Sequence, residues 1–386
     1  MRTSFLGLLP AVCCVLFFLP PLLAEEEGEA LVDPGIKQAR SAVTMALAWL
    51  RDHQNRDGTW SCKNFMAACT KGACAGPGST DDYDAGLTGL ALLAFLGAGN
   101  SHKHGPFKKT VLEGVKALKG MQTEDGCFGK KSPEGHWIYN HAICTMAAAE
   151  AYGLSGKSEL LLGMSQKAVD FLVGCQNPYM GWRYGSRPGD NDTSCTAWAT
   201  MALKTADISG LSVPKETFDG ALAWFDKVTD DVYYKTGYTS KGDSGARLQE
   251  ALGKFEPSEA MTAAALTCRI FLLRDKAPKR ADVQGAANLV RQSPPKWDVK
   301  AGTIDMYYWF WASNAMFQMG DEYWKLWEEP LRNALIPTQR RDGCETGSWD
   351  PVDAWGTAGG RVYATAMCAL ALESYSRFKR MTEEGK

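Results

Sequence analysis

The sequence has almost no net charge, and it lacks any long apolar run beyond its first residues. Its 386 residues carry a formal net charge of −2 at pH 7. Charge therefore gives no argument for binding nucleic acid or anionic lipid. After residue 24, no segment is apolar for long enough to span a bilayer. The sequence predicts no nucleic-acid partner and no membrane span beyond its N-terminus.

The first 24 residues, MRTSFLGLLPAVCCVLFFLPPLLA, have the features of a secretory signal peptide. One Arg near the start precedes an apolar core, and the small residue Ala24 precedes the acidic residues 25–27. The alternative is a retained N-terminal anchor. Pro20 and Pro21 interrupt the run and no basic flank follows, which favours cleavage after Ala24. We expect a secreted or periplasmic protein.

Cysteine is abundant, and export would permit disulfides. Two of the twelve cysteines lie in the N-terminal apolar segment. Cys62, Cys69 and Cys74 crowd one loop beside Gly and Ala. The spacing predicts at least one disulfide in this loop, although the sequence leaves the pairing open.

A short motif recurs along the chain, each time after an amphipathic run. Each intact copy has a Gln, then a turn element and usually an aromatic residue. The copies are QNRDGTW (54–60), MQTEDGCFG (121–129), CQNPYMGW (175–182), RQSPPKW (291–297) and TQRRDGCETGSW (338–349), with a degraded copy in VYYKTGYTS (232–240). Recurrence at long intervals indicates a repeat architecture. We interpret the motif as a structural connection in which Trp60 is a packing residue.

A second kind of run, rich in Ala and other small residues, follows each copy. The runs begin at Asp84, His141, Asp192, Glu259, Asp305 and Arg361. Small residues let a helix pack on several sides, which suits an inner position, whereas the runs before each motif carry charge on one face. The chain therefore contains six helix pairs over residues 36–378, preceded by an acidic segment (25–35) and followed by a polar tail (379–386).

Six alternating outer and inner helices can close into a ring that buries the inner helices. An open solenoid is the alternative. It would need polar end repeats, yet the last inner run, AMCALALESY, is as apolar as the internal ones. The predicted fold is a single all-α domain, an α/α toroid of six inner and six outer helices.

Alignment of the inner runs brings their first residues into one register, at one mouth of the toroid. The three aspartates are good N-cap residues, so capping alone could explain them. Capping does not explain His141 or Arg361. Alternatively, acids that converge in a partly dry mouth raise the pKa of at least one, which can then donate a proton. We predict catalytic roles for Asp192, His141, Asp84 and Asp305.

The remaining members of the register are predicted to contact a substrate. Glu259 and Arg361 lie at the mouth, and Arg361 would hold an anionic group. Tyr308 and Trp198 are aromatic residues of the inner runs that could line a cavity for an apolar ligand or stack on a sugar.

The spacing of Gln, Asp-Gly and Trp between paired helices resembles the prenyltransferase and squalene oxidase repeat of the terpenoid cyclase and protein prenyltransferase superfamily. The resemblance covers residues 36–378 and implies an α/α toroid. Protonation-initiated cyclases carry Asp-x-Asp-Asp at the start of an inner helix. Here Asp190, Asn191 and Asp192 match, but Thr193 replaces the last Asp. The resemblance implies an acid-initiated cyclase or lyase acting on an apolar, isoprenoid-like substrate.

Protein prenyltransferases of this superfamily use zinc held by Asp, Cys and His. Asp192 and Cys195 have the right types but lie three positions apart rather than two, and Arg361 stands where a His is needed. Zinc would then require His141 as the third ligand. No cofactor is predicted, and zinc at Asp192, Cys195 and His141 is the alternative. The thioester domain of complement-like proteins shares the toroid and carries a reactive Gly-Cys-Gly-Glu-Gln motif. This motif is missing here, and DGCETG around Cys344 does not replace it.

Two other functions stay open. One is a non-catalytic toroid that binds a ligand, a glycan or another exported protein. The other is a carbohydrate-active α/α-barrel enzyme with paired acids. A closed aromatic pocket with one desolvated Asp would favour cyclisation, and an open groove with paired carboxylates would favour glycans. A centre filled by side chains would favour the binding protein.

Overall fold

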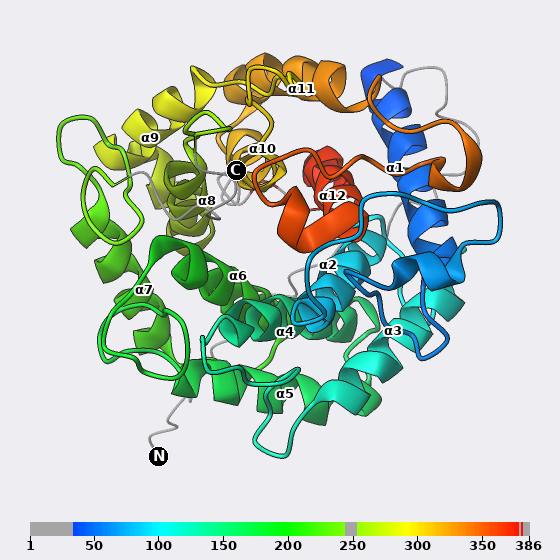
Figure 1. Ribbon diagram of the computed structural model, residues 1–386. Coiled ribbons are helices and arrows are strands. Elements are labelled where there is room, and N and C mark those ends of the chain that lie inside the picture. Colours follow the sequence, from blue (N-terminus) through cyan, green and yellow to red (C-terminus); the bar gives the residue numbers. More distant parts are fainter. Residues whose placement is uncertain (1–33, 244–252, 378–379, 381–386) are drawn as a thin grey trace, which may run out of the picture.

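The computed structural model describes residues 34–243, 253–377 and 380, and its helices alternate between an outer and an inner ring (Figure 1). The outer helices are α1 (Pro34–Asp52), α3 (Lys108–Met121), α5 (Glu159–Gly174), α7 (Lys215–Val228), α9 (Ala281–Arg291) and α11 (Asp321–Leu335). The inner helices are α2 (Asp84–Gly97), α4 (Trp137–Leu154), α6 (Thr193–Ser209), α8 (Ala260–Leu273), α10 (Met306–Gln318) and α12 (Gly356–Leu372). The predicted signal peptide lies outside the described residues.

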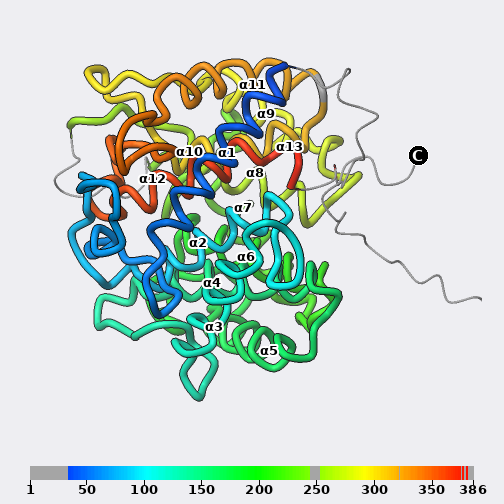
Figure 2. The backbone as a smooth tube through the Cα atoms, turned by 90° about the vertical axis from the view of Figure 1, so that its right-hand side faces the viewer, coloured from blue at the N-terminus to red at the C-terminus, as the bar shows by residue number. Residues whose placement is uncertain are grey.

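The ring is closed. Each inner helix contacts the next one in chain order, and α12 contacts α2. Figure 2 shows the same toroid from the side. The all-α toroid predicted from the repeat is therefore confirmed, and the open solenoid is wrong. No helix in the described part of the chain combines the length and the apolar character needed to cross a membrane.

The recurrent Gln connects neighbouring repeats. The side-chain amide of Gln54 donates to Gly58 O in its own turn and to Thr110 O in the next outer helix, both at 3.0 Å. Three other copies repeat this pair of bonds: Gln122 to Gly126 and Met164, Gln176 to Met180 and Thr217, and Gln339 to Gly347 and Ala42. Because Ala42 belongs to α1, the last copy joins the final repeat to the first.

The recurrent Trp connects the two helices of one repeat. The indole Nε1 of Trp60 donates to Leu50 O at 2.7 Å, and its backbone N–H donates to Thr88 Oγ1 of α2 at 3.0 Å. Trp182 and Trp349 make the equivalent bonds, to Leu172 and Thr196 and to Leu335 and Thr365. Trp60 is fully buried, so its predicted role as a packing residue is confirmed.

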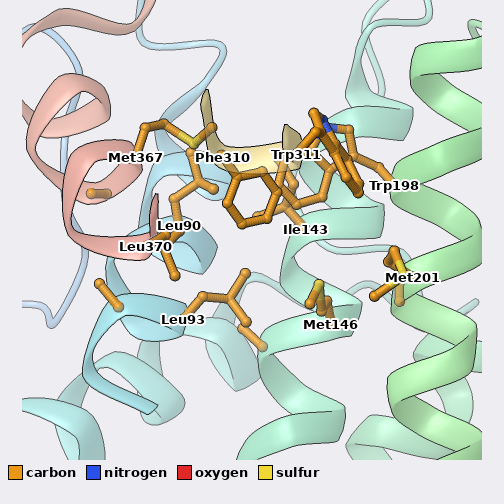
Figure 3. Close-up of a cluster of buried hydrophobic side chains, with 14 of the residues drawn as sticks. Leu90, Leu93, Ile143, Met146, Trp198, Met201, Phe310, Trp311, Met367 and Leu370 are labelled. Atoms are coloured by element: carbon orange, nitrogen blue, oxygen red, sulfur yellow. The ribbon is translucent and has the colours of Figure 1, made fainter. Parts of the chain in front are cut away.

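The centre of the toroid is filled by side chains. Residues from five inner helices point toward one another in Figure 3, and none is more than 7% exposed: Leu90, Leu93, Ile143, Met146, Trp198, Met201, Phe310, Trp311, Met367 and Leu370. Long and aromatic side chains on facing helices thus occupy the space that the ring encloses. The ring therefore surrounds a packed core, so a ligand site has to lie at an end of the ring, outside that core.

The ten cysteines in the described part of the chain are all free thiols. The disulfide predicted among Cys62, Cys69 and Cys74 is therefore not present. Cys62 instead donates a hydrogen bond from Sγ to Ala358 O at 2.8 Å. The Sγ atoms of Cys69 and Cys74 both face His53.

Candidate functional site at the mouth of the toroid

The six register residues lie in the first turns of the inner helices, at one end of the ring. Asp192, Glu259 and Asp305 are the N-cap residues of α6, α8 and α10. Asp84 is the first residue of α2, and His141 lies one turn into α4. In α12, Gly360 has φ +66°, so regular helical geometry begins at Arg361. The predicted register is thus present, and the surroundings of each residue decide its role.

Asp192 is the strongest candidate for a proton donor. Its Oδ1 accepts a hydrogen bond from the backbone N–H of Cys195 at 2.7 Å, so it caps α6, which was the alternative to a catalytic role. Its Oδ2 is buried and meets no donor in hydrogen-bonding geometry. Burial raises the pKa of Asp192 to about 6, against the opposing effects of Cys195, Arg183 and Tyr238. Asp192 therefore combines a fixed position with an oxygen that is free to carry a proton.

Tyrosines from several elements surround Asp192. The hydroxyls of Tyr184 and Tyr238 lie 2.5 Å apart, and the Tyr139 ring lies 6.1 Å from the Tyr184 ring. The hydroxyl of Tyr307 lies 2.7 Å from Ser194 Oγ. Tyr139, Tyr184 and Tyr307 are partly exposed. We call Tyr139, Tyr184, Tyr238 and Tyr307 the tyrosine rim. Its hydroxyls and ring faces could contact a ligand at the end of the ring where Asp192 lies.

A second acidic position contains two neighbouring carboxylates. Asp305 caps α10 through Tyr308 N and accepts a hydrogen bond from Ser258 Oγ at 2.6 Å. Asp353, in the loop before α12, accepts hydrogen bonds from Met306 N at 3.2 Å and from the Tyr363 hydroxyl at 3.3 Å. Burial and the charge of Asp305 raise the pKa of Asp353 to about 7. Sequence analysis missed Asp353, because it lies outside the aligned helix starts.

Asp84 and Glu259 have structural partners. Asp84 Oδ1 accepts a hydrogen bond from Cys62 N at 2.7 Å, which ties the preceding loop to α2, and burial raises the pKa of Asp84. Asp84 does not cap α2, because the N-cap residue is Tyr83. Glu259 forms an ion pair with Lys235 at 3.1 Å and accepts a hydrogen bond from Thr262 Oγ1. The predicted catalytic role of Asp84 and the predicted substrate contact of Glu259 gain no support from these surroundings.

His141 is a structural residue rather than a proton carrier. Its Nδ1 accepts from the backbone N–H of Phe128 at 3.1 Å, where other repeats use a Thr hydroxyl. Its Nε2 lies 3.1 Å from Ala168 O in α5 and donates to it. The imidazole is fully buried, which lowers its pKa to about 3. Both nitrogens are used, so the predicted catalytic role of His141 is replaced by a role in joining helices.

Arg361 is likewise fully engaged. Its Nη2 lies 2.6 Å from Asp350 Oδ1 and 3.0 Å from Glu345 Oε1, and its Nε donates to Ala75 O at 2.7 Å. Its Nη1 donates to Ser348 Oγ at 2.9 Å. The side chain is 2% exposed. It holds two loops together, and four of its five N–H donors already have partners, so its surroundings give no support to the anionic group that it was predicted to bind.

The two predicted aromatic contacts also differ from expectation. The Tyr308 hydroxyl donates to Ser293 O at 2.9 Å, and its ring packs edge-on against Trp327 of α11, so it faces the outer helices. Its neighbour Tyr307 faces the mouth instead. Trp198 stacks on Phe310 at 5.4 Å and belongs to the central core (Figure 3). Trp198 lies at the end of that core nearest the mouth, where its ring centroid is 6.4 Å from that of Tyr307.

The alternative zinc set is not assembled. Among the described residues, Asp192, Cys195 and His141 do not form a group of metal donors. One oxygen of Asp192 is used for capping, and both His141 nitrogens are bonded to the backbone of the protein. The mouth therefore offers acid chemistry without a zinc site built from these three residues.

Comparison with known proteins identifies the architecture. No family model and no curated protein matches the chain. Among solved structures, it is similar to the α-1,6-mannanase GH76A from Salegentibacter sp., with a TM-score of 0.56 and 10% identity over 88% of this chain and 98% of that one. It is also similar to the type II terpene cyclase MstE from Scytonema, with a TM-score of 0.53 and 15% identity over 88% and 98%.

The chain has the α/α-toroid fold of these enzymes. An α-amylase from Clostridium perfringens is a further neighbour, with a TM-score of 0.52 and 12% identity over 87% of this chain and 98% of that one. The fold resemblance inferred from the repeat is thus confirmed. Identities this low establish shape alone, so the chemistry has to be argued from the residues of this chain.

Proposed function

We propose that this toroid is an acid-dependent enzyme in which Asp192 donates a proton to a substrate held by the tyrosine rim. The observation that carries the proposal is Asp192 Oδ2, a fully buried carboxylate oxygen that accepts no hydrogen bond of normal geometry, although the Tyr238 hydroxyl lies near enough to lower the pKa of Asp192. Several buried polar atoms of the described residues lack a partner, but Asp192 Oδ2 is the one among them that belongs to a carboxyl group beside the partly exposed tyrosine rim. The N-cap bond through Oδ1 would hold the carboxyl group in position during the reaction.

The acidity of Asp192 supports this role. A pKa of about 6 keeps a substantial protonated fraction in mildly acidic to neutral solution, which an ordinary Asp does not. General acids work best when their pKa is near the working pH, and they typically contribute about 10²- to 10⁴-fold in rate. The Tyr238 hydroxyl, paired with Tyr184, would link Asp192 to the partly exposed rim for reprotonation.

The favoured substrate is a sugar unit of a glycan. The packed centre argues against a deep cavity for a folded polyprene chain (Figure 3). Aromatic faces, hydroxyls and carboxylates gathered at this end of the ring suit a polar, ring-shaped ligand. The mannanase and the amylase that share the fold add support. An apolar isoprenoid is the second substrate class, favoured by the position of Asp192 as the middle acid of a partial Asp-x-Asp-Asp.

A non-catalytic function has one specific observation in its favour. The centre of the ring is filled by side chains, which is the arrangement expected of a toroid that binds a partner without turnover. In this alternative, the tyrosine rim would bind a glycan or another exported protein without turnover. The signal peptide predicted at residues 1–24 would place either function outside the cytoplasm.

The test is a substrate screen with matched variants. Purified full-length chain is incubated with α-1,6-linked mannooligosaccharides, with α-glucans and with geranylgeranyl dihydroxybenzoate, and products are followed by mass spectrometry. Asp192→Asn keeps the cap and removes the proton, so turnover should fall about 10²-fold or more. Asp207→Asn, an exposed acid on the same helix that pairs with Lys204, is the control.

The outcomes separate the hypotheses. Turnover that survives Asp192→Asn would exclude Asp192 as the acid. Saturable binding without turnover of any compound would support the binding protein. Turnover confined to the isoprenoid would exclude the glycan.

A further inference from the structure

We propose that His53, Cys69, Cys74 and Cys344 form a tetrahedral metal site, with Zn²⁺ as the ion that best fits the donors. One ligand atom from each residue lies within 4.8 Å of the other three. Three sulfurs and one imidazole nitrogen are a common donor set for structural zinc. This inference is independent of the proposed function, because none of the four residues belongs to the tyrosine rim or to the acids of the mouth.

The distances fit a tetrahedron around one ion. His53 Nε2 lies 3.5 Å from the Sγ of Cys69, 3.3 Å from that of Cys74 and 3.5 Å from that of Cys344. With Zn–S near 2.3 Å and Zn–N near 2.0 to 2.1 Å, a tetrahedral site separates nitrogen from sulfur by about 3.6 Å. The donors thus stand nearly where an ion needs them.

Hydrogen bonding alone does not account for this cluster. His53 Nδ1 lies 2.8 Å from Trp49 O, which places the imidazole proton on Nδ1 and leaves Nε2 with one lone pair. That lone pair can accept one hydrogen bond from a thiol, yet three sulfurs lie at similar distances from it. A metal ion satisfies all three sulfurs and the nitrogen together.

The surroundings of His53 also resemble those of a metal ligand. Metal-binding imidazoles usually donate their second N–H to a carbonyl or carboxylate, which fixes the tautomer and the ring plane. Here Trp49 O takes that role, and the Trp49 ring stacks on the imidazole with 4.1 Å between centroids and 22° between planes. The side chain is 2% exposed, so the ring is held in one orientation.

The loops that carry the cysteines are fixed independently of a metal. Glu345, next to Cys344, accepts a hydrogen bond from Ala75 N at 2.7 Å, next to Cys74. Arg361 binds Glu345 and also donates to Ala75 O. The two loops are therefore already held face to face. A pocket of about 240 Å³ lined by residues that include Thr70, Lys71 and Cys344 gives an ion access from the surface.

A site with four protein ligands has no open coordination position, which points to a structural role. The four donors come from two distant parts of the chain. His53, Cys69 and Cys74 follow α1, whereas Cys344 follows α11 and is 291 positions from His53. A bound ion would hold the first and last repeats together at the point where the toroid closes. The competing arrangement, one disulfide, would leave a third thiol and His53 unused.

Metal analysis of the purified full-length chain tests the proposal. We expect about one zinc per chain, and loss of that zinc in Cys344→Ala. Cys127→Ala is the matched control, since both cysteines follow Asp-Gly in a repeat motif and Cys127 is outside the cluster. Because a variant could fail to fold, the metal is also removed from the wild-type chain with a chelator and replaced by Co²⁺.

Each outcome of the metal analysis either supports or contradicts the proposed site. Thiolate-to-cobalt charge-transfer bands of a tetrahedral site, together with protection of three thiols from alkylation by zinc, would support the proposal. A stoichiometric tetrahedral iron would keep the site and change the ion. Absence of metal with three reactive thiols would overturn it, as would a disulfide joining any two of Cys69, Cys74 and Cys344.

Discussion

Asp192 and Arg361 occupy the same position in two repeats, yet the protein treats them in opposite ways. The Arg361 guanidinium binds Ala75 O, Ser348 Oγ and Asp350. It thereby joins the loop around residue 75 to the loop around residue 348. Asp192 has one oxygen bonded to Cys195 N and one buried oxygen that accepts no hydrogen bond of normal geometry. A shared register therefore fixes where a side chain lies, while the loops around it determine whether it stabilises the fold or remains available for chemistry.

The largest expected effect is at Arg361. Arg361→Ala leaves Glu345 and Asp350 without their main buried partner and should lower the free energy of unfolding by about 3 to 5 kcal/mol. Arg340→Ala is the control, because Arg340 pairs with the same two carboxylates from a more exposed position and should cost about 1 kcal/mol or less. Denaturant unfolding of both variants measures the difference; equal losses would show that Arg361 is not the principal clamp.

The next effect is a pH dependence at Asp192. Its pKa of about 6 exceeds the usual unfolded value of about 3.9, so the folded state binds the proton more tightly. The stability that protonation provides is present below about pH 4 and is lost as pH rises through about 6. Asp192→Asn should remove this loss, with a relative gain of roughly 3 kcal/mol at most above pH 6.

Two further variants, Asp192→Ser and Asp353→Asn, test whether the pH dependence of stability comes from Asp192. Asp192→Ser should flatten the pH profile in the same way, because Ser also caps helices. Asp353→Asn should act over a window that extends to about pH 7, because burial and Asp305 raise the pKa of Asp353 further. A profile unchanged by Asp192→Asn would show that Asp192 titrates normally and would remove the basis for its role as an acid.

His141 should affect stability and leave chemistry nearly unchanged. His141→Ala leaves Phe128 N without its acceptor, removes the bond to Ala168 O and empties a buried space, and should cost about 2 to 3 kcal/mol. Since burial lowers its pKa to about 3, the stability it provides is present above about pH 6.5 and is lost as pH falls toward 3. Thermal unfolding at several pH values measures this. A large fall in turnover at unchanged stability would restore His141 to the catalytic group.

The smallest expected effect separates the cap of α6 from its acid. Asp192→Ala removes both functions, whereas Asp192→Asn removes only the proton. Neither variant carries a carboxyl group at this position, so at any pH the two should differ in stability by about 1 kcal/mol, which is the usual contribution of an N-cap. Equal stabilities would show that the bond to Cys195 N contributes little.

The sequence predicted the architecture well, because repetition multiplies weak local signals. The Gln that joins neighbouring repeats and the Trp that joins paired helices mark each hairpin, and their hydrogen bonds are the reason for their recurrence. The site was predicted in part. Asp192 was identified from its position, but alignment of helix starts could not reveal that Phe128 N binds His141 or that Ala75 O binds Arg361.

Other features had no signal along the chain. Asp353 acquires its raised pKa from burial and from Asp305, which only the folded ring brings near. Tyr307 and Tyr308 are adjacent, and helical geometry turns one toward the mouth and the other toward α9 and α11. The cluster of His53 with three cysteines requires loops from opposite ends of the chain to meet, so spacing suggested a local disulfide instead.

The bond between Gln339 and Ala42 O has a consequence for biosynthesis. Domains generally begin to fold from the N-terminus while synthesis continues. Here α1 packs against α11 and α12, which emerge last. The first helix can therefore complete its native packing only after nearly the whole chain has been made, and closing so long a loop carries an entropic cost. Nascent chains that stop before the sixth repeat should expose the apolar face of α1 and become substrates for chaperones or proteases.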